Sequence, residues 1–415
     1  MNGAASGSRP SDLLPASILG LLGARGPLTR AELASALRVS SASITQASKE
    51  LMSKGMVLEL GQLASGGGRP ARPLSLVGSA GQIVGVKVTA SHMAVVAAKL
   101  DGEATLTRNI PLDVSRPDAL DIAARSLQEV LAAVDGPVLG VGVGIPGSVD
   151  SLESGVADSP TIGWRNAQVG TVLRQRLGVP VLVENDVNAL AVAEQVYGVG
   201  IKYSTYLVVT IGRGIGCGIV IGGEVFRGAG GGAGEIGHVP VADDGPLCPY
   251  GHSGCLESLI GSAGLVRRAV ELGFFDATGL QGLNAELEAI RMLAARAERD
   301  PSVAEGLFGW AGRLLGSAVA GAVNLLNPET VVVLGEGSEH WALWEPGFAE
   351  SFRSKLISSR RWVPYIVDPW DEDKWALGAA ALVIASSFDK DGSTGYQGEL
   401  VRERLSVAAS NRAKA

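Results

Sequence analysis

The chain has 415 residues, of which 46% are hydrophobic and 5% aromatic, and its formal net charge is −7 at pH 7. This length exceeds that of one typical core, so we expect two or three domains whose cores consist mainly of Val, Leu, Ile and Ala. The negative charge argues against general affinity for nucleic acids. Three cysteines are too few for a full disulfide framework, which favours a reducing compartment.

No targeting or membrane segment is predicted. Residues 1–10 are rich in Gly and Ser and lack the apolar stretch of a secretory signal, so we expect them to form a disordered tail. Apolar runs further along are interrupted by Gly or Arg before they reach membrane-spanning length. We therefore expect a cytoplasmic protein without a membrane partner.

Charge is distributed unevenly along the chain. Residues 1–76 hold eight Lys/Arg and only four Asp/Glu, although the chain as a whole is acidic. A basic N-terminal region on an acidic body indicates that only this region would meet a polyanion such as DNA.

Residues 11–77 have the pattern of a small helical domain followed by a hairpin. Apolar spacing predicts a helix over 11–22, and Thr29 with Glu32 forms a capping box for a second helix. A third helix is predicted over 41–53 after a tight turn. An apolar run, a Gly-rich tip and a second apolar run then predict a β-wing. Together these elements indicate a winged helix-turn-helix DNA-binding domain.

The outward face of the third helix carries polar side chains that would lie in the major groove. Gln46 could bond an adenine edge, and Lys49 a phosphate or a guanine. Arg69 at the wing tip could enter the minor groove. The candidate DNA-binding residues are Ser43, Thr45, Gln46, Lys49 and Arg69. The alternative is a helical domain for protein contacts with a solvated polar face.

Beyond residue 80 strand and helix patterns alternate, which predicts an α/β fold. A strand pattern over 82–89 is followed by an amphipathic helix over 118–134, and buried strands are predicted at 138–145 and 179–183. The last of these strands runs directly into the polar segment 184–189.

Polar groups are densest between residues 207 and 257. Apolar runs at 207–211 and 219–221, separated by glycines, predict a hairpin whose glycines permit a tight turn and close backbone approach. Two carboxylates, one histidine and two cysteines follow: Glu235, His238, Cys248, Cys255 and Glu257. This density indicates a functional site, and the alternative is a loop-rich connector.

This stretch resembles the signature of the ROK family, which comprises repressors, open reading frames and sugar kinases. The family pattern is a Gly-rich hairpin, Gly-Glu-x-Gly-His, and Cys-x-Cys-Gly-x-x-Gly-Cys-x-Glu, and here only Tyr250 departs from it, at the middle cysteine. The resemblance implies two actin-like (ribonuclease H-like) α/β lobes around a cleft over residues 80–387, preceded by a winged helix-turn-helix. We expect residues 388–415 to form a mobile C-terminal tail.

The resemblance also implies a sugar site. Asp186 stands where the family's kinases keep their catalytic base, and the implied ligands mostly offer acceptors that suit ring hydroxyls. Alternatively, Asn185 and Asp186 cap a helix, and Glu235 forms a structural pair with His238. The implied sugar-binding residues are Asn185, Asp186, Glu235, His238 and Glu257.

A zinc site is implied by the same resemblance. In the family one histidine and three cysteines hold zinc and brace the loop that presents the sugar ligands. This chain keeps His238, Cys248 and Cys255, whereas Tyr250 is a poor ligand because its phenol is protonated at neutral pH. His252 could substitute, and the alternative is a metal-free loop with two thiols.

The first hairpin departs from the family's kinases, which carry Gly-x-Asp-x-Gly-Gly-Thr-Lys there and use the aspartate to help hold magnesium. Lys87 replaces that aspartate, and Thr89 and Ala90 replace the two glycines. An ammonium cannot ligate a cation, and the added Cβ atoms obstruct the approach of a phosphate. Glu336, in the turn that faces the nucleotide in the kinases, also disfavours a polyanion. We expect no ATP binding and no enzyme activity, although Lys87 could instead be a snorkelling residue on an edge strand.

Taken together, these features predict a sugar-responsive DNA-binding transcriptional regulator. We expect a repressor of carbohydrate uptake or catabolism genes that binds operator DNA and a small sugar effector as a homodimer or homotetramer. One alternative is a ROK-type ATP-dependent sugar kinase with an added DNA-binding domain, which the retained Asp186 supports. Another is a DNA-binding scaffold that responds to no ligand.

Overall fold

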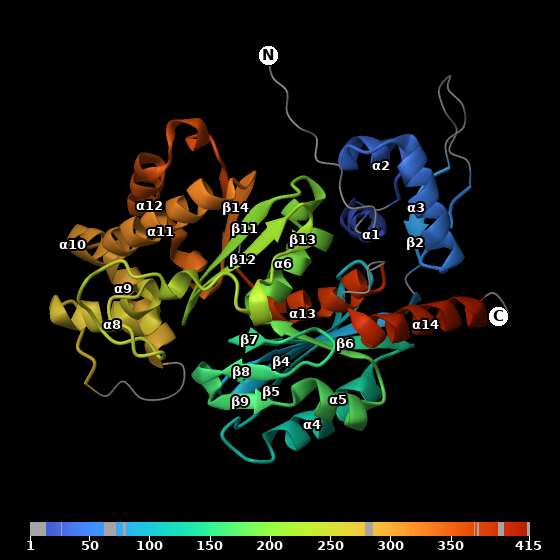
Figure 1. Ribbon diagram of the computed structural model, residues 1–415, viewed down its shortest axis with the longest axis horizontal. Helices are drawn as coiled ribbons and strands as arrows, with labels where there is room; N and C mark the ends of the chain where they lie inside the picture. The colour runs from blue at the N-terminus through green and yellow to red at the C-terminus, as the bar shows by residue number, and fades with distance from the viewer. Residues whose placement is uncertain are drawn as a thin grey trace. The chain divides into compact units, whose positions relative to one another are not determined.

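The computed structural model describes residues 14–25, 27–61, 72–77, 80–278, 285–368, 370–371, 373–388 and 394–412. Their contacts divide the chain into two compact units, whose elements are labelled in Figure 1. Unit 1 contains the described residues up to Ser204, together with Val220–Gly232 and those from Asp373 onward. Unit 2 contains Thr205–Ile219 and Ala233–Glu372.

The N-terminal part of unit 1 consists of short helices and one antiparallel strand pair: α1 (Leu14–Arg25), α2 (Arg30–Leu37), α3 (Ser41–Ser53), β1 (Val57–Glu59) and β2 (Leu74–Leu76). The predicted capping box is confirmed, because the Thr29 hydroxyl accepts from the Glu32 backbone N–H and the Glu32 carboxylate accepts from the Thr29 N–H. Arg38, in the left-handed conformation, ends α2 and turns the chain into α3. The predicted Gly-rich tip lies outside the described residues.

The larger part of unit 1 is built on a five-stranded sheet of order β10-β6-β3-β4-β5. The strands β3, β6 and β10 are parallel, and β4 and β5 continue from β3 as an antiparallel meander. Their bounds are β3 (Gln82–Val88), β4 (His92–Lys99), β5 (Ala104–Pro111), β6 (Val138–Ile145) and β10 (Val181–Asn185). A small sheet and a short turn follow β6: β7 (Ser148–Val149), β8 (Ala157–Ser159), η2 (Pro160–Ile162) and β9 (Trp164–Ala167).

Helices cover this sheet on both faces. The apolar faces of α4 (Ala119–Ala133) and α5 (Val169–Leu177) pack on the valines of the sheet and form one core. The helices α6 (Asp186–Val196) and α13 (Asp373–Ser386) pack on each other, and α13 also packs against β3 and β6. Short turns follow at η3 (Val199–Ile201) and η4 (Ala229–Gly231).

Glycines in two strands allow α13 to lie unusually close to the sheet. A Cβ on Gly85 would collide with the Ala376 carbonyl, and a Cβ on Gly142 with the Ala379 carbonyl. Only glycine permits such an approach of helix backbone to strand backbone.

The expected mobile tail after residue 388 is wrong for the described part of it. Residues Gly395–Arg412 form α14, whose Val401 and Leu405 side chains are fully buried. The Val181 backbone N–H donates to Gln397 Oε1, which ties the helix to β10. The segment was expected to be mobile because its composition is polar. A helix can nevertheless pack with only a few apolar side chains on one face.

Unit 2 repeats the strand order of the first sheet, as β13-β12-β11-β14-β15. The central pairings β11–β14 and β14–β15 are parallel, as β3–β6 and β6–β10 are in unit 1. The bounds are β11 (Tyr206–Ile211), β12 (Ile215–Ile221), β13 (Glu224–Val225), β14 (Thr330–Leu334) and β15 (Tyr365–Val367). The predicted hairpin of strands around the glycines at 212–218 is thus present.

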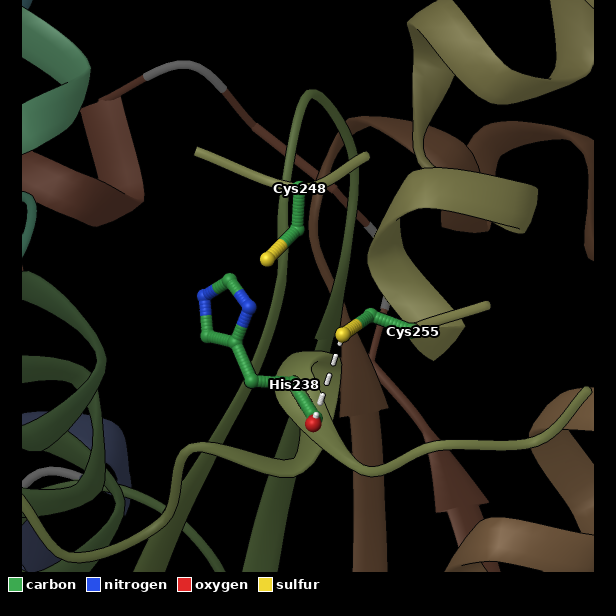
Figure 2. A group of neighbouring side chains, drawn as sticks. All are labelled: His238, Cys248 and Cys255. Carbon is green, nitrogen blue, oxygen red and sulfur yellow. Dashed lines mark hydrogen bonds between the residues drawn. The ribbon is translucent and has the colours of Figure 1, made fainter. Parts of the chain in front are cut away.

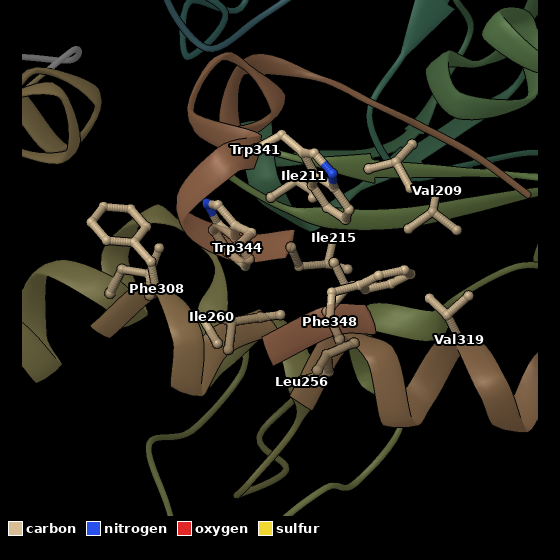
Figure 3. Close-up of a cluster of buried hydrophobic side chains, with 14 of the residues drawn as sticks. Val209, Ile211, Ile215, Leu256, Ile260, Phe308, Val319, Trp341, Trp344 and Phe348 are labelled. Carbon is tan, nitrogen blue, oxygen red and sulfur yellow. The ribbon is translucent and has the colours of Figure 1, made fainter. Parts of the chain in front are cut away.

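Helices of unit 2 enclose a core that includes most of its aromatic side chains. Figure 3 shows Trp341, Trp344 and Phe348 packed with Ile211 and Ile215 of the sheet. The elements are η5 (Ile236–His238), α7 (Leu256–Ile260), α8 (Ser262–Glu271), α9 (Ala285–Ala297), α10 (Pro301–Val303), η6 (Ala304–Gly309), α11 (Trp310–Leu326), η7 (Glu336–His340), α12 (Trp341–Lys355) and η8 (Ser358–Arg360).

Within the part of the chain that the structure describes, one helical stretch is long and apolar enough to cross a membrane. This stretch is Pro301–Leu326. It contradicts the expectation that every apolar run is interrupted before it reaches membrane-spanning length. However, 56% of its most apolar window is buried, and Leu315, Val319 and Val323 belong to the core of unit 2. The stretch is therefore weak support for a membrane segment, since a core helix passes the same test.

The close approach of α13 gives a stability prediction. Gly142→Ala should lower the free energy of unfolding by about 1–3 kcal/mol, because its Cβ meets helix backbone that cannot move aside without repacking. Gly321→Ala, in α11 with open space around the added Cβ, is the matched control and should be neutral or stabilising. Urea denaturation followed by circular dichroism measures both, and equal midpoints would contradict the packing argument.

Candidate functional site

The structure places Asn185 and Asp186 at the junction of β10 and α6 in unit 1. Asn185 is the N-cap of α6: its Oδ1 accepts from the Asn188 N–H at 3.0 Å, and its Nδ2 donates to the Gly147 carbonyl at 2.7 Å. The capping alternative is therefore confirmed for Asn185. Asp186 is the first residue of α6 and is 8% exposed.

Asp186 forms a buried ion pair with Lys87, which the sequence does not reveal. The Lys87 ammonium donates to Asp186 Oδ2, and both side chains are largely buried. The same ammonium lies 4.5 Å from the centroid of the Trp375 ring at the start of α13, a distance that permits a cation–π contact. Because β3 is the central strand of its sheet, the alternative of Lys87 as a snorkelling edge residue is wrong.

A second buried carboxylate, Glu184, stands beside this pair and was not singled out from the sequence. Its Oε2 accepts from Arg227 Nε at 2.6 Å, and its Oε1 accepts from the Asn185 N–H at 2.8 Å and from Asn188 Nδ2 at 3.3 Å. A buried carboxylate needs such partners to stay charged. In the sequence Glu184 is marked only as a charged residue directly after a predicted buried strand. That position does not reveal that Arg227 is its partner.

The carboxylate of Glu257 in unit 2 turns back onto the β11–β12 turn. Its Oε2 accepts from the Ile215 N–H at 2.9 Å. A Cβ on Gly214 would come within 2.7 Å of this oxygen, so a larger residue there would displace the Glu257 carboxylate. One oxygen of Glu257 therefore has a structural role.

Glu235 and His238 lie together in unit 2, as the structural alternative proposes. The Glu235 Oε2 and His238 Nε2 atoms are 3.9 Å apart, and the Glu235 side chain is 47% exposed whereas that of His238 is 18% exposed. At this distance the two groups attract each other without a hydrogen bond.

His238, Cys248 and Cys255 converge from separate loops. Their ligand atoms all lie within 4.8 Å of one another, and Figure 2 shows the imidazole and the two sulfurs facing a common space. The His238 Nδ1 atom is buried and, among the described residues, has no hydrogen-bond partner. Cys255 Sγ donates to the His238 carbonyl at 3.5 Å. Cys217, in β12, is a separate buried thiol, as expected.

The two thiols of this cluster differ in acidity. Burial by itself would raise the pKa of Cys248, but hydrogen bonds from the backbone of His252 and Tyr250 and from the Cys255 thiol outweigh it and lower that pKa. Burial, followed by the neighbouring Cys248, raises the pKa of Cys255. The donor set of one imidazole and two thiols suits zinc, which binds thiolate and neutral imidazole.

Neither His252, which could have substituted for the missing cysteine, nor Tyr250 completes this cluster. His252 is not part of the described cluster, and its carbonyl accepts from the Cys248 N–H at 2.8 Å. The Tyr250 ring packs edge-on against the His238 ring, with centroids 4.6 Å apart. The expected substitution of the missing cysteine by His252 is therefore not supported.

The two turns that differ from the kinase pattern are occupied by their own side chains. In the β3–β4 turn the Thr89 hydroxyl bonds the His92 ring at 2.9 Å and accepts from the backbone N–H of His92 at 3.1 Å. In unit 2 the Glu336 carboxylate covers Gly212, where an added Cβ would collide with it. A phosphate at either turn would meet a filled space or a carboxylate.

Four of the five candidate DNA-contacting residues lie on α3, and they differ in exposure and local hydrogen bonding. Gln46 and Lys49 of α3 are exposed. The Ser43 hydroxyl lies 2.8 Å from that of Ser40, and Thr45 Oγ1 donates to the Ser41 carbonyl at 2.7 Å. Arg69 lies outside the described residues. Gln46 and Lys49 are therefore the side chains of this set with the fewest local contacts.

The buried ion pair gives a second prediction. Lys87→Met leaves the Asp186 carboxylate buried without its cation and should reduce the free energy of unfolding by about 3–5 kcal/mol. Lys87→Met combined with Asp186→Leu should recover much of this loss, because the remaining charge is removed as well. Denaturation of the two single variants and the double variant measures the coupling, and losses that simply add would contradict the pairing.

Comparisons with known proteins agree with this geometry. The ROK family profile matches residues 83–386. The chain is 27% identical over 379 residues to the DNA-binding transcriptional dual regulator NagC of Escherichia coli K12, covering 89% of this chain and 91% of NagC. It is 27% identical over 381 residues to the xylose repressor of Bacillus subtilis strain 168, covering 88% of this chain and 92% of that protein.

Solved structures show the same fold. A ROK family transcriptional regulator, a homologue of the Escherichia coli MLC protein, superposes with a TM-score of 0.72 over 96% of this chain and 99% of that one, at 24% identity. A ROK family glucokinase from Streptomyces griseus, in complex with glucose and AMPPNP, gives a TM-score of 0.62 over 73% of this chain and 99% of its own, at 29% identity. With a family profile that spans most of its length, this chain belongs to the ROK family.

Proposed function

We propose that the protein is a sugar-responsive DNA-binding transcriptional repressor of genes for carbohydrate uptake or catabolism. The observation that carries the choice of a regulator over a kinase is the Lys87–Asp186 ion pair, which places an ammonium against the carboxylate where a ROK kinase has its base. The names of its relatives, a transcriptional regulator and a xylose repressor, support the same conclusion.

The N-terminal part is proposed to be the winged helix-turn-helix that binds operator DNA. It combines α2 and α3, joined by a tight turn, with the β1–β2 pair, and it is the basic region of an acidic chain. We place α3 in the major groove, with Gln46 reading a base edge and Lys49 on a phosphate or a guanine. Ser43, Thr45 and Arg69 complete the proposed contacts, with the first two held by their own local bonds.

The effector is proposed to be a free sugar bound by Asn185, Asp186, Glu235, His238 and Glu257. These groups offer mostly acceptors, which match the hydroxyl donors of a sugar ring. Since one oxygen of Glu257 accepts from the Ile215 N–H, its other oxygen is the one assigned to the ligand. Regulation then requires that the sugar bind the DNA-free state more tightly than the DNA-bound state.

The absence of kinase activity is also part of the proposal. The Lys87 ammonium would repel the divalent cation that phosphoryl transfer needs, and it holds the Asp186 carboxylate in an ion pair. The competing proposal, an ATP-dependent sugar kinase with an added DNA-binding domain, is favoured by the retained Asp186 and by the fold shared with a glucokinase.

We further propose that His238, Cys248 and Cys255 hold a structural zinc ion that braces the loops around Glu235 and Glu257. The orphaned Nδ1 of His238 and the convergence of the two sulfurs support this assignment. When bound, zinc would cross-link these loops through its ligands. The protein is proposed to act in the cytoplasm as a homodimer or homotetramer.

The proposal predicts sugar-dependent release of DNA. A high-affinity duplex is first selected from a random pool with the full chain, and a thermal-shift screen of monosaccharides, including xylose and N-acetylglucosamine, and of sugar phosphates identifies the effector. The effector should then weaken binding to the duplex by about 5–150-fold in fluorescence anisotropy, the usual range for coupled sites. Glu235→Gln should abolish this effect while DNA binding stays intact, because Glu235 is half exposed and its loss should not unfold the protein.

Gln46→Ala is the complementary control, since it should weaken DNA binding while the thermal shift by the sugar is unchanged. Arg108→Ala, an exposed cation on β5, should change neither property. Two outcomes would contradict the proposal: DNA affinity that ignores every compound tested, as in a ligand-blind scaffold, or ATP-dependent phosphorylation of a hexose, as in the kinase alternative.

A further inference from the structure

Among the described residues, the cluster of His238, Cys248 and Cys255 has no fourth protein ligand. Its described donors are one imidazole nitrogen and two sulfurs, and no other His, Cys, Asp or Glu side chain of the described residues joins them. Tyr250, at the position of the missing cysteine, is half exposed, and its ring is nearly perpendicular to that of His238, with centroids 4.6 Å apart. A tetrahedral zinc ion held here would therefore have three ligands from the chain.

The orientation of His238 fixes which nitrogen would bind the metal. Its Nδ1 is buried, has no hydrogen-bond partner among the described residues and lies on the side of the two sulfurs (Figure 2). Its Nε2 is 3.9 Å from Glu235 Oε2. An imidazole that binds zinc through one nitrogen commonly gives its other N–H to a carboxylate, which orients the ring and raises its basicity. Glu235 Oε2, at 3.9 Å, is beyond hydrogen-bond distance in this structure and would have to move closer to supply that carboxylate.

We infer that this site is an open zinc site, with Cys248, Cys255 and His238 Nδ1 as ligands and the fourth position available to an exchangeable donor. The inference rests on the proposed zinc site. Zinc sites with three protein ligands hold water or another small donor at the fourth position, whereas closed structural sites use four. The donor class that fits is a neutral or anionic small ligand such as water, imidazole or a low-molecular-weight thiol.

Cobalt substitution tests the open position, because the d–d and thiolate charge-transfer bands of Co²⁺ report the ligand set. In the full chain, imidazole should shift the d–d bands of the Co²⁺ form. Tyr250→Cys should supply a fourth ligand, so that its Co²⁺ spectrum is insensitive to imidazole and its metal affinity rises by roughly tenfold or more. Tyr250→Phe is the matched control and should behave as the parent protein does.

Three results would overturn the open-site inference. They are a Co²⁺ spectrum of the parent chain that imidazole leaves unchanged, a loss of binding in Tyr250→Phe, and no Co²⁺ binding by the parent chain at all. None of these results depends on DNA or sugar, so the proposed repressor function is judged separately.

A different observation concerns α13, which has a contact of interest at each end. At its start the Trp375 ring lies over the Lys87 ammonium, which is paired with Asp186. Just after its end the Ser387 carbonyl accepts from Lys54 Nζ at 3.4 Å, and this ammonium lies 4.7 Å from the centroid of the Phe388 ring. Lys54 is the C-cap residue of α3. One helix of about 21 Å therefore connects the Asp186 site with the end of the proposed recognition helix.

The packing of α13 suits it to transmit a small displacement. It rests on Gly85 and Gly142, and its buried residues from Ala376 to Ala381 are all Gly or Ala, whereas its large buried side chains, Leu382, Val383 and Ile384, lie near its C-terminal end. Helices packed in this way move by shear, in steps of about 1–2 Å. The Lys54 contact would pass such a step to α3, because it joins the two helices directly.

We propose that α13 couples the sugar site to the DNA-binding part: a ligand that engages Asp186 changes the Lys87–Trp375 contact and displaces α13, and Lys54 carries the displacement to α3. This proposal rests on the proposed function. It requires a two-state element that both sites bias, and α13 with its two end contacts is that element.

Two variants at the α3 end test this coupling. Lys54→Gln removes the ammonium, and Phe388→Leu removes the ring while keeping an apolar side chain in the buried position. Both should bind sugar and DNA separately within about threefold of the parent protein, while the factor by which sugar weakens DNA binding falls from the parent value toward one. Isothermal calorimetry measures sugar binding, and fluorescence anisotropy measures DNA binding with and without sugar.

Lys99→Gln is the matched control, since Lys99 also pairs with a carboxylate four residues away but lies at the end of β4 and takes no part in the contact of Lys54 with Ser387 and Phe388. It should leave the coupling factor unchanged. Full coupling in both Lys54→Gln and Phe388→Leu would overturn the role of α13. Loss of coupling in the parent protein would instead count against the proposed function, so the two failures are distinguishable.

Discussion

The ion pair between Lys87 and Asp186 links three elements of unit 1 at one point. Lys87 lies on the central strand β3, Asp186 begins α6, and the Lys87 ammonium also contacts Trp375 at the start of α13. Two charges are removed from water there, so each holds the other in place, and neither can change alone without leaving a buried charge unpaired. The glycines of β3 and β6 allow α13 to come close enough for this contact, because no Cβ separates the helix from the sheet.

The same ion pair bears on which of two functions, sugar phosphorylation or sugar recognition without catalysis, the fold supports here. A kinase of this family must admit a divalent cation and a triphosphate next to its base. Here the Lys87 ammonium is paired with the carboxylate at that position. The turn carrying Thr89 and His92 and the turn carrying Glu336 are closed by their own side chains. Hydrogen-bonding groups suited to hydroxyls remain, and in the proposed function they recognise a sugar without phosphoryl transfer.

Several polar groups in and next to the proposed ligand set make structural contacts. Asn185 caps α6, Glu257 accepts from the backbone of the β11–β12 turn, and Glu184 fixes Arg227. Such contacts fix the rotamers of polar side chains before any ligand arrives, which lowers the entropy lost on binding. In the loops of unit 2 a metal ion held by His238, Cys248 and Cys255 would likewise fix side chains in place. The Tyr250 ring packs against the imidazole of His238.

The sequence by itself determined the local features of this protein. The capping box at Thr29, the hairpin around the glycines of 212–218, the alternating strands and helices, and the His and Cys spacing all follow from neighbours within a few residues, where propensity and periodicity act. What only the tertiary structure decided involves partners far apart in the chain: Lys87 with Asp186, Glu184 with Arg227, and Lys54 with Phe388. The tertiary structure also decided that α14 packs. A few buried side chains such as Val401 hold this helix against the rest of unit 1, although its overall composition is polar. Charge type and spacing predict that a partner is needed, but the partner is chosen by which strands and helices the fold brings together.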